Sequence, residues 1–164
     1  MQGEFSKKGR AAVTADGKQV YEVEYACAET SYPQSFLDIV KVWKHLVMKE
    51  GVSPSGAAFE GSGIGGALVI AACLWCRDHG IPLPSSITLS DPVVAPCGGV
   101  AIPYFSQADI DDPCAYPLIA DFYGFPPVNL ILSEDFPYAE QADAVFQRMK
   151  DHGVECTSGE EMIS

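Results

Sequence analysis

Three glycines in the middle of the chain have the spacing of a phosphate-binding turn. Gly61, Gly63 and Gly66 follow a short apolar run and precede a long apolar stretch, where a strand would pass into a helix. Such a turn holds a pyrophosphate at the helix N-terminus, and Asp91 follows at the end of the next predicted strand, as a ribose-binding carboxylate would. The same glycines also occur wherever a strand turns sharply into a tightly packed helix. Nucleotide binding and a structural turn are both compatible with this pattern.

Cysteine is the second residue type that could carry chemistry. Cys73 and Cys76 have the spacing of a redox motif, but they lie inside an apolar stretch, which favours packing in the core. Cys97 lies in a loop after a predicted strand and is the thiol expected nearest the strand ends, although a loop cysteine without a role explains it as well. No spacing of cysteine and histidine fits zinc, so we expect no metal and no other cofactor.

These residues are positioned by alternating strands and helices. Residues 11–14 and 19–26 flank Asp16-Gly17, a favoured tight-turn pair, and predict a hairpin. Apolar residues then recur at helical spacing in three stretches, separated by short apolar runs that predict strands. The predicted helices lie at residues 33–50, 67–79 and 136–152, and the predicted strands at residues 57–60, 86–90 and 127–132. This alternation predicts an α/β fold with a parallel sheet.

Active sites of parallel sheets lie at the carboxyl ends of the strands. Residues 61–66, 90–97 and 133–136 are therefore the segments that would form a site. Three carboxylates would gather there for acid/base chemistry, namely Asp91, Glu134 and Asp135. Alternatively, Glu134 and Asp135 simply complement the N-terminus of the last helix.

Length and composition restrict the class of protein. With 164 residues, of which 48% are hydrophobic, we expect one domain spanning residues 1–164, with a flexible start at residues 1–10. The formal net charge of -12 disfavours nucleic acid and membrane-surface partners. No apolar run reaches the roughly 20 residues of a membrane span and no export signal is present, so we expect a cytoplasmic protein whose six cysteines are free.

Several segments together carry a family resemblance. Glu60-Gly61-Ser62-Gly63-Ile64-Gly65-Gly66 is followed by an apolar helix, by Gly80-Ile81-Pro82-Leu83-Pro84 and by a strand ending in Ser90-Asp91-Pro92. Residues 32–38 and 112–128 add matching proline-containing motifs on either side. In this order the segments resemble the nucleophile-elbow region of hormone-sensitive-lipase-like esterases in the α/β-hydrolase superfamily, over roughly residues 20–157.

The resemblance implies an architecture and an assembly. It implies a reduced α/β-hydrolase-like three-layer sandwich, a mostly parallel sheet of about four to five strands with helices on both faces. The family's oxyanion-loop strand would lie between the strands at 19–26 and 57–60 and is missing. Those two strands would then pair directly, or another chain would supply a strand. We therefore expect a homodimer or a complex with a second hydrolase-like chain.

The resemblance also implies where a nucleophile would stand. A serine hydrolase needs a serine on a strained turn, a histidine, an orienting carboxylate and backbone donors for the oxyanion. Aligned without gaps, Gly63 falls at the nucleophile, between the elbow's outer glycines Gly61 and Gly65. Ser62 falls one residue earlier, where its side chain should point away from the pocket.

The other catalytic groups are only partly matched. Asp135, with Glu134 second, matches the triad carboxylate, and the backbone donors of Ile64 and Gly65 would remain of an oxyanion hole. Nothing before residue 20 resembles the family's His-Gly-Gly-Gly loop, and the chain ends before the family's catalytic histidine. The three histidines present are expected to be structural: His45, within a helix, and His79 and His152, at helix ends.

The function expected from these observations is not that of a working serine esterase. We expect a pseudoenzyme that binds a small acyl or carboxylate ligand, or that serves as a subunit-interaction module. The alternative is an enzyme of altered chemistry, completed by a partner chain or using the carboxylates at the strand ends. Nucleotide binding at the glycine turn is the third hypothesis.

Overall fold

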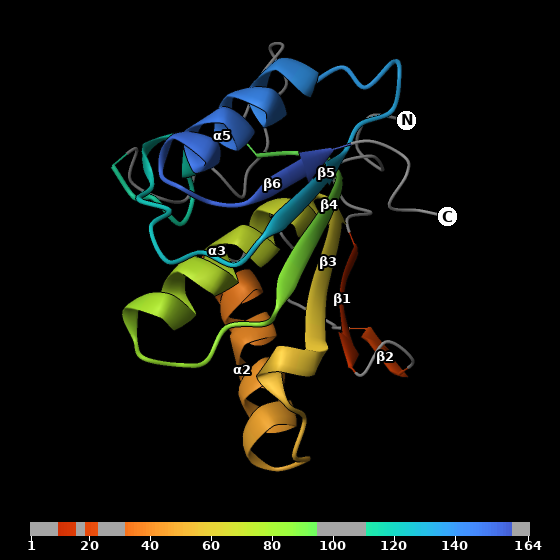
Figure 1. Cartoon of the computed structure of the whole chain (residues 1–164), viewed down its shortest axis with the longest axis vertical. Helices are drawn as coiled ribbons and strands as arrows, with labels where there is room; N and C mark the ends of the chain where they lie inside the picture. Colours follow the sequence, from red (N-terminus) through yellow and green to blue (C-terminus); the bar gives the residue numbers. More distant parts are fainter. Residues whose placement is uncertain (1–9, 16–18, 23–31, 95–110, 159–164) are drawn as a thin grey trace.

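The fold is built around one sheet. The computed structural model describes residues 10–15, 19–22, 32–94 and 111–158. Within them, six strands lie in the order β2-β1-β3-β4-β5-β6, accompanied by three α-helices (Figure 1). The strands are β1 (Arg10–Ala15), β2 (Gln19–Glu22), β3 (Ala57–Gly63), β4 (Ser86–Pro92), β5 (Val128–Ile131) and β6 (Cys156–Ser158). The helices are α2 (Gln34–Met48), α3 (Ile64–Asp78) and α5 (Ala139–Asp151), with short 3-10 helices η1 (Pro54–Gly56) and η2 (Pro117–Ile119).

The predicted α/β fold is confirmed. Strands β3, β4, β5 and β6 are parallel to one another, and α3 and α5 lie in two of the connections between them. Every helix and strand expected from periodicity is present. The sheet has six strands rather than four to five because β6, at Cys156–Ser158, is too short for a periodic pattern to reveal it.

The hairpin at the start of the described chain corrects one expectation. β1 lies between β2 and β3 and is antiparallel to both. The predicted direct pairing of the strand at 19–26 with β3 is therefore not observed for its described part, Gln19–Glu22. Within the described residues, the position beside β3 is filled by β1, the first arm of the hairpin, and not by another chain. Residues 23–26 lie outside the described residues. Burial explains the order. Ala11, Ala12 and Val13 are each at most 2% exposed, as suits an inner strand, whereas Val20 of β2 is 52% exposed, as suits an edge.

Helix α3 is the centre of the core. Nearly all of its residues are buried, including Leu68, Ile70 and Leu74. A helix that is apolar all round must be covered all round. Accordingly, α3 contacts β1, β3 and β4 on one side and α2 and η2 on the others. None of the described helices has the combination of length and apolar character that a membrane crossing requires.

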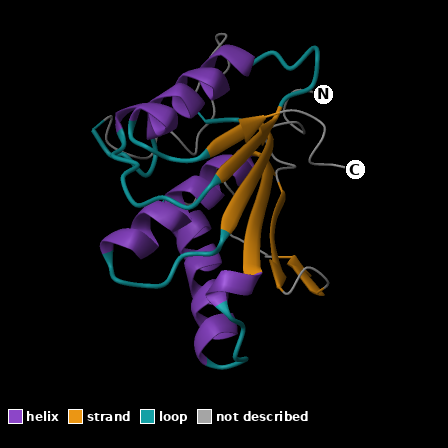
Figure 2. Ribbon diagram, viewed as in Figure 1, coloured by secondary structure: helices purple, strands orange, loops and turns teal. Residues whose placement is uncertain are grey.

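All three described helices pack on the same face of the sheet, as Figure 2 shows. Trp43 of α2 contacts Phe59 of β3 edge-on, with ring centroids 5.0 Å apart. Residues of α3 and α5 line one small pocket together with the adjacent Leu89 and Leu130. These two leucines lie on the same face of the sheet as Phe59. The described residues thus form two layers, whereas helices on both faces were expected. The apolar side chains of β3, β4 and β5 point mainly to one face, so only this face gives helices an apolar surface.

The opposite face of the sheet carries polar side chains. Glu60, Thr88, Asn129 and Thr157 stand side by side across β3, β4, β5 and β6. Thr157 Oγ1 donates a hydrogen bond to Asn129 Oδ1 (2.9 Å), and Thr14 Oγ1 of β1 donates to Glu60 Oε2 (3.3 Å). This row of polar residues is not covered by any helix of the described part of the chain.

Candidate functional site

The expected elbow is formed by the junction of β3 and α3. The strand continues through Gly63 and the helix begins at Ile64, so no loop separates them and α3 starts earlier than the predicted residue 67. Gly63 has φ 58° and ψ −135°, a conformation open to glycine and strained for other residues. Ile64 and Gly65 form the first turn of α3 and are buried. The sharp turn expected of a nucleophile elbow is therefore present, with glycine at its apex.

Close packing explains the flanking glycines. A Cβ atom on Gly61 would lie 2.6 Å from the carbonyl oxygen of Gly65, and one on Gly66 would lie 2.6 Å from Cβ of Pro92. Both positions therefore require glycine for β3, α3 and β4 to approach one another. The structural interpretation of the glycine pattern accounts for these two positions without a bound nucleotide.

Ser62 does not occupy the apex. Residues of β3 alternate between the two faces, and Ser62 lies on the face opposite Gly61 and Gly63, paired in register with Ser90 of β4. The structure therefore keeps the Ser62 hydroxyl on the polar face of the sheet, apart from the elbow.

Asp91 forms a bulge at the end of β4. Ser62 pairs with Ser90 and Gly63 with Pro92, so Asp91 is the extra residue, with φ 45°. Asp91 Oδ1 accepts a hydrogen bond from the backbone N–H of Ser133 (2.7 Å), and Oδ2 accepts one from the Ser133 hydroxyl (2.5 Å). The carboxylate thus joins the end of β4 to the segment after β5.

The other two candidate carboxylates lie in that segment. Glu134 and Asp135 are exposed, and they occupy a turn closed by a hydrogen bond from the Phe136 N–H to the Ser133 carbonyl (3.2 Å). Buried Phe136 anchors the turn. The structure therefore brings Asp91, Glu134 and Asp135 to the same edge of the sheet, as predicted, but leaves the last two solvated.

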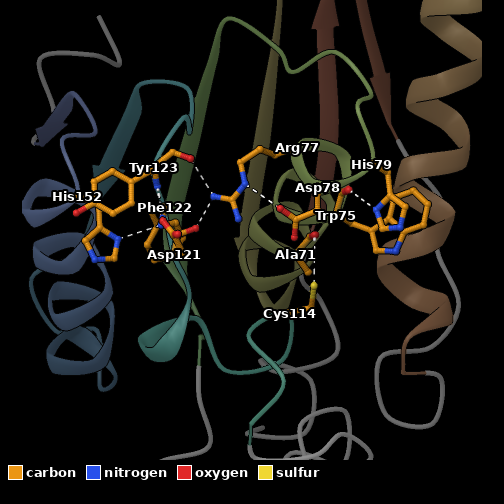
Figure 3. Close-up of polar contacts among 10 residues, drawn as sticks. All are labelled: Ala71, Trp75, Arg77, Asp78, His79, Cys114, Asp121, Phe122, Tyr123 and His152. Carbon is orange, nitrogen blue, oxygen red and sulfur yellow. Dashed lines mark hydrogen bonds and ion pairs between the residues drawn. The ribbon is translucent and has the colours of Figure 1, made fainter.

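All three histidines lie at the opposite end of the parallel strands from Gly63, where those strands begin. His45 is in the last turn of α2, and His79 and His152 directly follow α3 and α5, which run back from the carboxyl ends of the strands. His45 Nε2 hydrogen-bonds Glu50 (3.1 Å) and is more than half exposed. His79 Nδ1 hydrogen-bonds the Trp75 carbonyl (2.8 Å) while its ring stacks on the Trp75 ring, as Figure 3 shows. No histidine of this chain is near Gly63.

The role of His152 was not expected from the sequence. Its Nδ1 accepts a hydrogen bond from the Phe122 backbone N–H (3.0 Å), and its ring stacks on Tyr123, with centroids 4.6 Å apart (Figure 3). Arg77 donates to the carbonyls of Asp121 and Tyr123 in the same segment. These contacts fasten residues 120–124 to the ends of two helices. The only sequence signal was the Asp-His-Gly tripeptide that ends both helices. A local motif of this kind does not indicate contacts with residues as distant in sequence as Phe122 and Tyr123.

Of the described cysteines, Cys73 and Cys76 are core residues, whereas Cys114 and Cys156 are half-buried. Cys73 and Cys76 are at most 1% exposed; burial raises the pKa of the Cys73 thiol well above its usual value and that of Cys76 to about 12. Burial likewise raises the pKa of Cys114 to about 12. The Cys73-x-x-Cys76 motif is therefore packed and unreactive, and Cys97 lies outside the described residues. Among the residues that the structure describes, no three His, Cys, Asp or Glu side chains group as a metal site would.

Comparison with known proteins agrees with this geometry. Residues 9–103, more than half of the chain, match the model of a family described as alpha/beta hydrolase fold. LipR of Mycobacterium tuberculosis, provisionally named an acetyl-hydrolase, is 25% identical over an alignment of 134 residues, and the match covers 70% of this chain and 43% of LipR.

Solved structures of esterases resemble the chain as well. An esterase from the bacterial hormone-sensitive lipase family superposes with a TM-score of 0.76 at 25% identity. An esterase/lipase from an uncultured bacterium superposes with a TM-score of 0.74, also at 25% identity. In both cases the match covers 85% of this chain and 54% of the other. The chain spans about half the length of the relatives it matches.

Proposed function

The chain belongs to the alpha/beta hydrolase fold family, and from this premise we propose that it acts as a non-catalytic binding or subunit-interaction module and not as a serine esterase. The observation that carries the proposal is Gly63 at the apex of the turn between β3 and α3. A nucleophilic serine hydrolase requires a hydroxyl there. Glycine keeps the backbone shape of the elbow but supplies no nucleophilic hydroxyl.

The surroundings of Gly63 support the proposal. The nearest serine in sequence, Ser62, faces the other side of the sheet. The histidines of the chain lie at the opposite edge, so none could take a proton from a hydroxyl near Gly63. The loss of nucleophile and base removes most of the rate enhancement of a catalytic triad, on the order of a millionfold in subtilisin.

The carboxylates give little support to acid/base catalysis as the alternative. Both oxygens of Asp91 already accept hydrogen bonds from Ser133. Glu134 and Asp135 are solvated, whereas carboxylates that act as general acids are usually held in closed surroundings. The expected effect on the last helix is not supported either, because α5 begins at Ala139 with Glu140 as the acidic residue of its first turn, so Glu134 and Asp135 lie outside that turn.

Hydrolysis of a p-nitrophenyl acyl ester tests the proposal. The chain and its Ser62→Ala and Gly63→Ser variants are all expected to show only the background rate, since a serine restored at residue 63 still lacks a base. Turnover abolished by Ser62→Ala would contradict the proposal. Turnover that survives Ser62→Ala but disappears in Asp91→Asn or Asp135→Asn would instead establish the acid/base alternative.

The interaction part of the proposal has its own test. We expect the chain to associate, either with itself or with a second hydrolase-like chain, because β2 and β6 leave hydrogen-bonding edges at the two ends of the described sheet. Light scattering at micromolar concentration should give a mass above 17.6 kDa, or the chain should copurify with a partner. A monomer that copurifies with no partner would count against this part.

A further inference from the structure

A cavity on the polar face of the sheet is separate from the elbow. It measures about 200 Å³ and lies over the first residues of β4 and β5, with Ser86, Thr88 and Asn129 in its lining. Glu155 and Thr157 complete its polar lining from the β6 side. The cavity lies where β4 and β5 begin, whereas Gly63 and Asp91 lie where β3 and β4 end. Because these strands are parallel, the cavity and the elbow are at opposite ends of the strands.

Asn129 is the unusual residue of the cavity. Its side chain is 5% exposed, and its Nδ2 is buried without a hydrogen-bond partner. Its Oδ1 accepts the hydrogen bond from Thr157. A half-turn of the amide would let Nδ2 donate to Thr157 and would leave Oδ1 unpaired instead, so one amide atom lacks a partner in either orientation. Leaving a buried polar atom unpaired costs free energy, and a hydrogen bond from that atom to a ligand would recover a similar amount.

We propose that this cavity binds a small uncharged polyol of monosaccharide size, held by the Asn129 amide and by the hydroxyls lining the cavity. A hydroxyl group both donates and accepts, so it satisfies either orientation of the amide. Asn129 is among the residues that line the cavity, and its Nδ2 is buried, so binding requires a rotation about the soft amide torsion that brings the amide edge to the cavity. The inference does not depend on the proposed function, because no residue of the elbow takes part.

Size and charge restrict the ligand class. A volume of about 200 Å³ would hold roughly six waters and is below the roughly 300 Å³ at which sites for drug-sized ligands begin. The described residues that line the cavity include the carboxylate of Glu155 and neither lysine nor arginine, and the chain has a net charge of -12, so an anion is disfavoured. A ligand with several hydroxyl groups pairs with whichever amide atom faces it, whereas a cation pairs only with Oδ1. A neutral ligand with several hydroxyl groups remains.

NMR titration of the ¹⁵N-labelled chain with D-glucose tests the proposal. The expected result is a saturable shift of the Asn129 side-chain amide and of the backbone amides of Thr88 and Thr157. Acetate and methylammonium are expected to give weaker binding. No saturable change with glucose, or tighter binding of acetate, would overturn the proposal.

Variants show whether the cavity itself binds. Asn129→Ala should weaken binding about tenfold, the loss of one or two hydrogen bonds. Thr88→Val keeps the β-branched shape and the strand, removes a hydroxyl, and should weaken binding severalfold even if Asn129→Ala unfolds. Ser62→Ala lies on the same face at the other end of the strands and should leave binding unchanged. Glucose shifts that persist undiminished in Thr88→Val would contradict the proposal.

Discussion

Two residues with positive φ end neighbouring strands, and each has a different physical reason for its conformation. Gly63 adopts its turn at no steric cost because it lacks a side chain. Asp91 is a non-glycine residue at φ 45°, a conformation that costs about 1–2 kcal/mol. Its two hydrogen bonds to Ser133 offset that cost. Asp91 therefore fastens the strand ends together, whereas Gly63 shapes the turn.

Packing at the elbow can be tested with Gly61. Gly61→Ala should lower the free energy of unfolding by roughly 1–3 kcal/mol, because its Cβ would lie 2.6 Å from the Gly65 carbonyl oxygen, which is rigid backbone. Urea unfolding measures the loss.

Gly51→Ala is the control for this prediction. Gly51 has φ 76° and open space around it, so its substitution should cost about 1–2 kcal/mol of backbone strain, with no steric clash added. If the Gly61 variant were as stable as the natural chain, the close approach of β3 and α3 would not explain the glycine.

At the scale of elements, the hairpin and the segment at 120–124 each depend on contacts between distant residues. β1 is an inner strand because β3 pairs with it over six residues. The segment at 120–124 is held by Arg77, by His152 and by Arg148, whose Nε donates to the Ala120 carbonyl (2.5 Å). The ends of α3 and α5 thus fix the chain that leads into β5.

The position of β1 predicts unequal effects of two valine substitutions. Val13→Ala should lower the free energy of unfolding by about 2 kcal/mol, since Val13 is 1% exposed between two strands. Val20→Ala in β2 should change it by less than about 0.5 kcal/mol, since Val20 is 52% exposed. Urea unfolding compares the two. Equal losses would mean that β1 is not the inner arm of the hairpin.

At the scale of the whole molecule, the described chain is a two-layer α/β structure whose sheet has one apolar and one polar face. The apolar face holds α2, α3 and α5, and the core beneath them contains buried thiols. Cys76 and Cys114 have thiol pKa values raised by burial from 9.0 to about 12. Folding therefore favours the protonated thiols.

The raised pKa values of these thiols predict that the free energy of unfolding falls at alkaline pH. Below about pH 9 both folded and unfolded chains keep the thiol protons, and the stabilisation is fully present. Between about pH 9 and 12 the unfolded chain loses these protons first, so the urea midpoint should fall as pH rises. A Cys76→Ala, Cys114→Ala variant should show a shallower fall over the same range. An identical pH dependence in both proteins would contradict the pKa shifts.

Much of this fold follows from local patterns. Periodicity predicted α2, α3 and α5 to within a few residues, and the apolar stretch after Gly66 predicted that α3 would be buried. The resemblance to esterases placed Gly63 at the turn. β6 was missed because three residues carry no period. The neighbours of β1 were missed because strand order depends on which surfaces bury best together, a property of distant segments.

The sequence by itself determined which residues could do chemistry, since a glycine at residue 63 has no hydroxyl in any fold, and it determined the order of the elements, because helix and strand periods are local. Only the tertiary structure decided which residues meet. It placed all three histidines at the edge away from Gly63, joined Asp91 to Ser133, put the described helices on one face, and left one amide atom of Asn129 without a partner beside a cavity. Burial and hydrogen bonding between distant segments make these choices, because each depends on surfaces that exist only after the chain has folded.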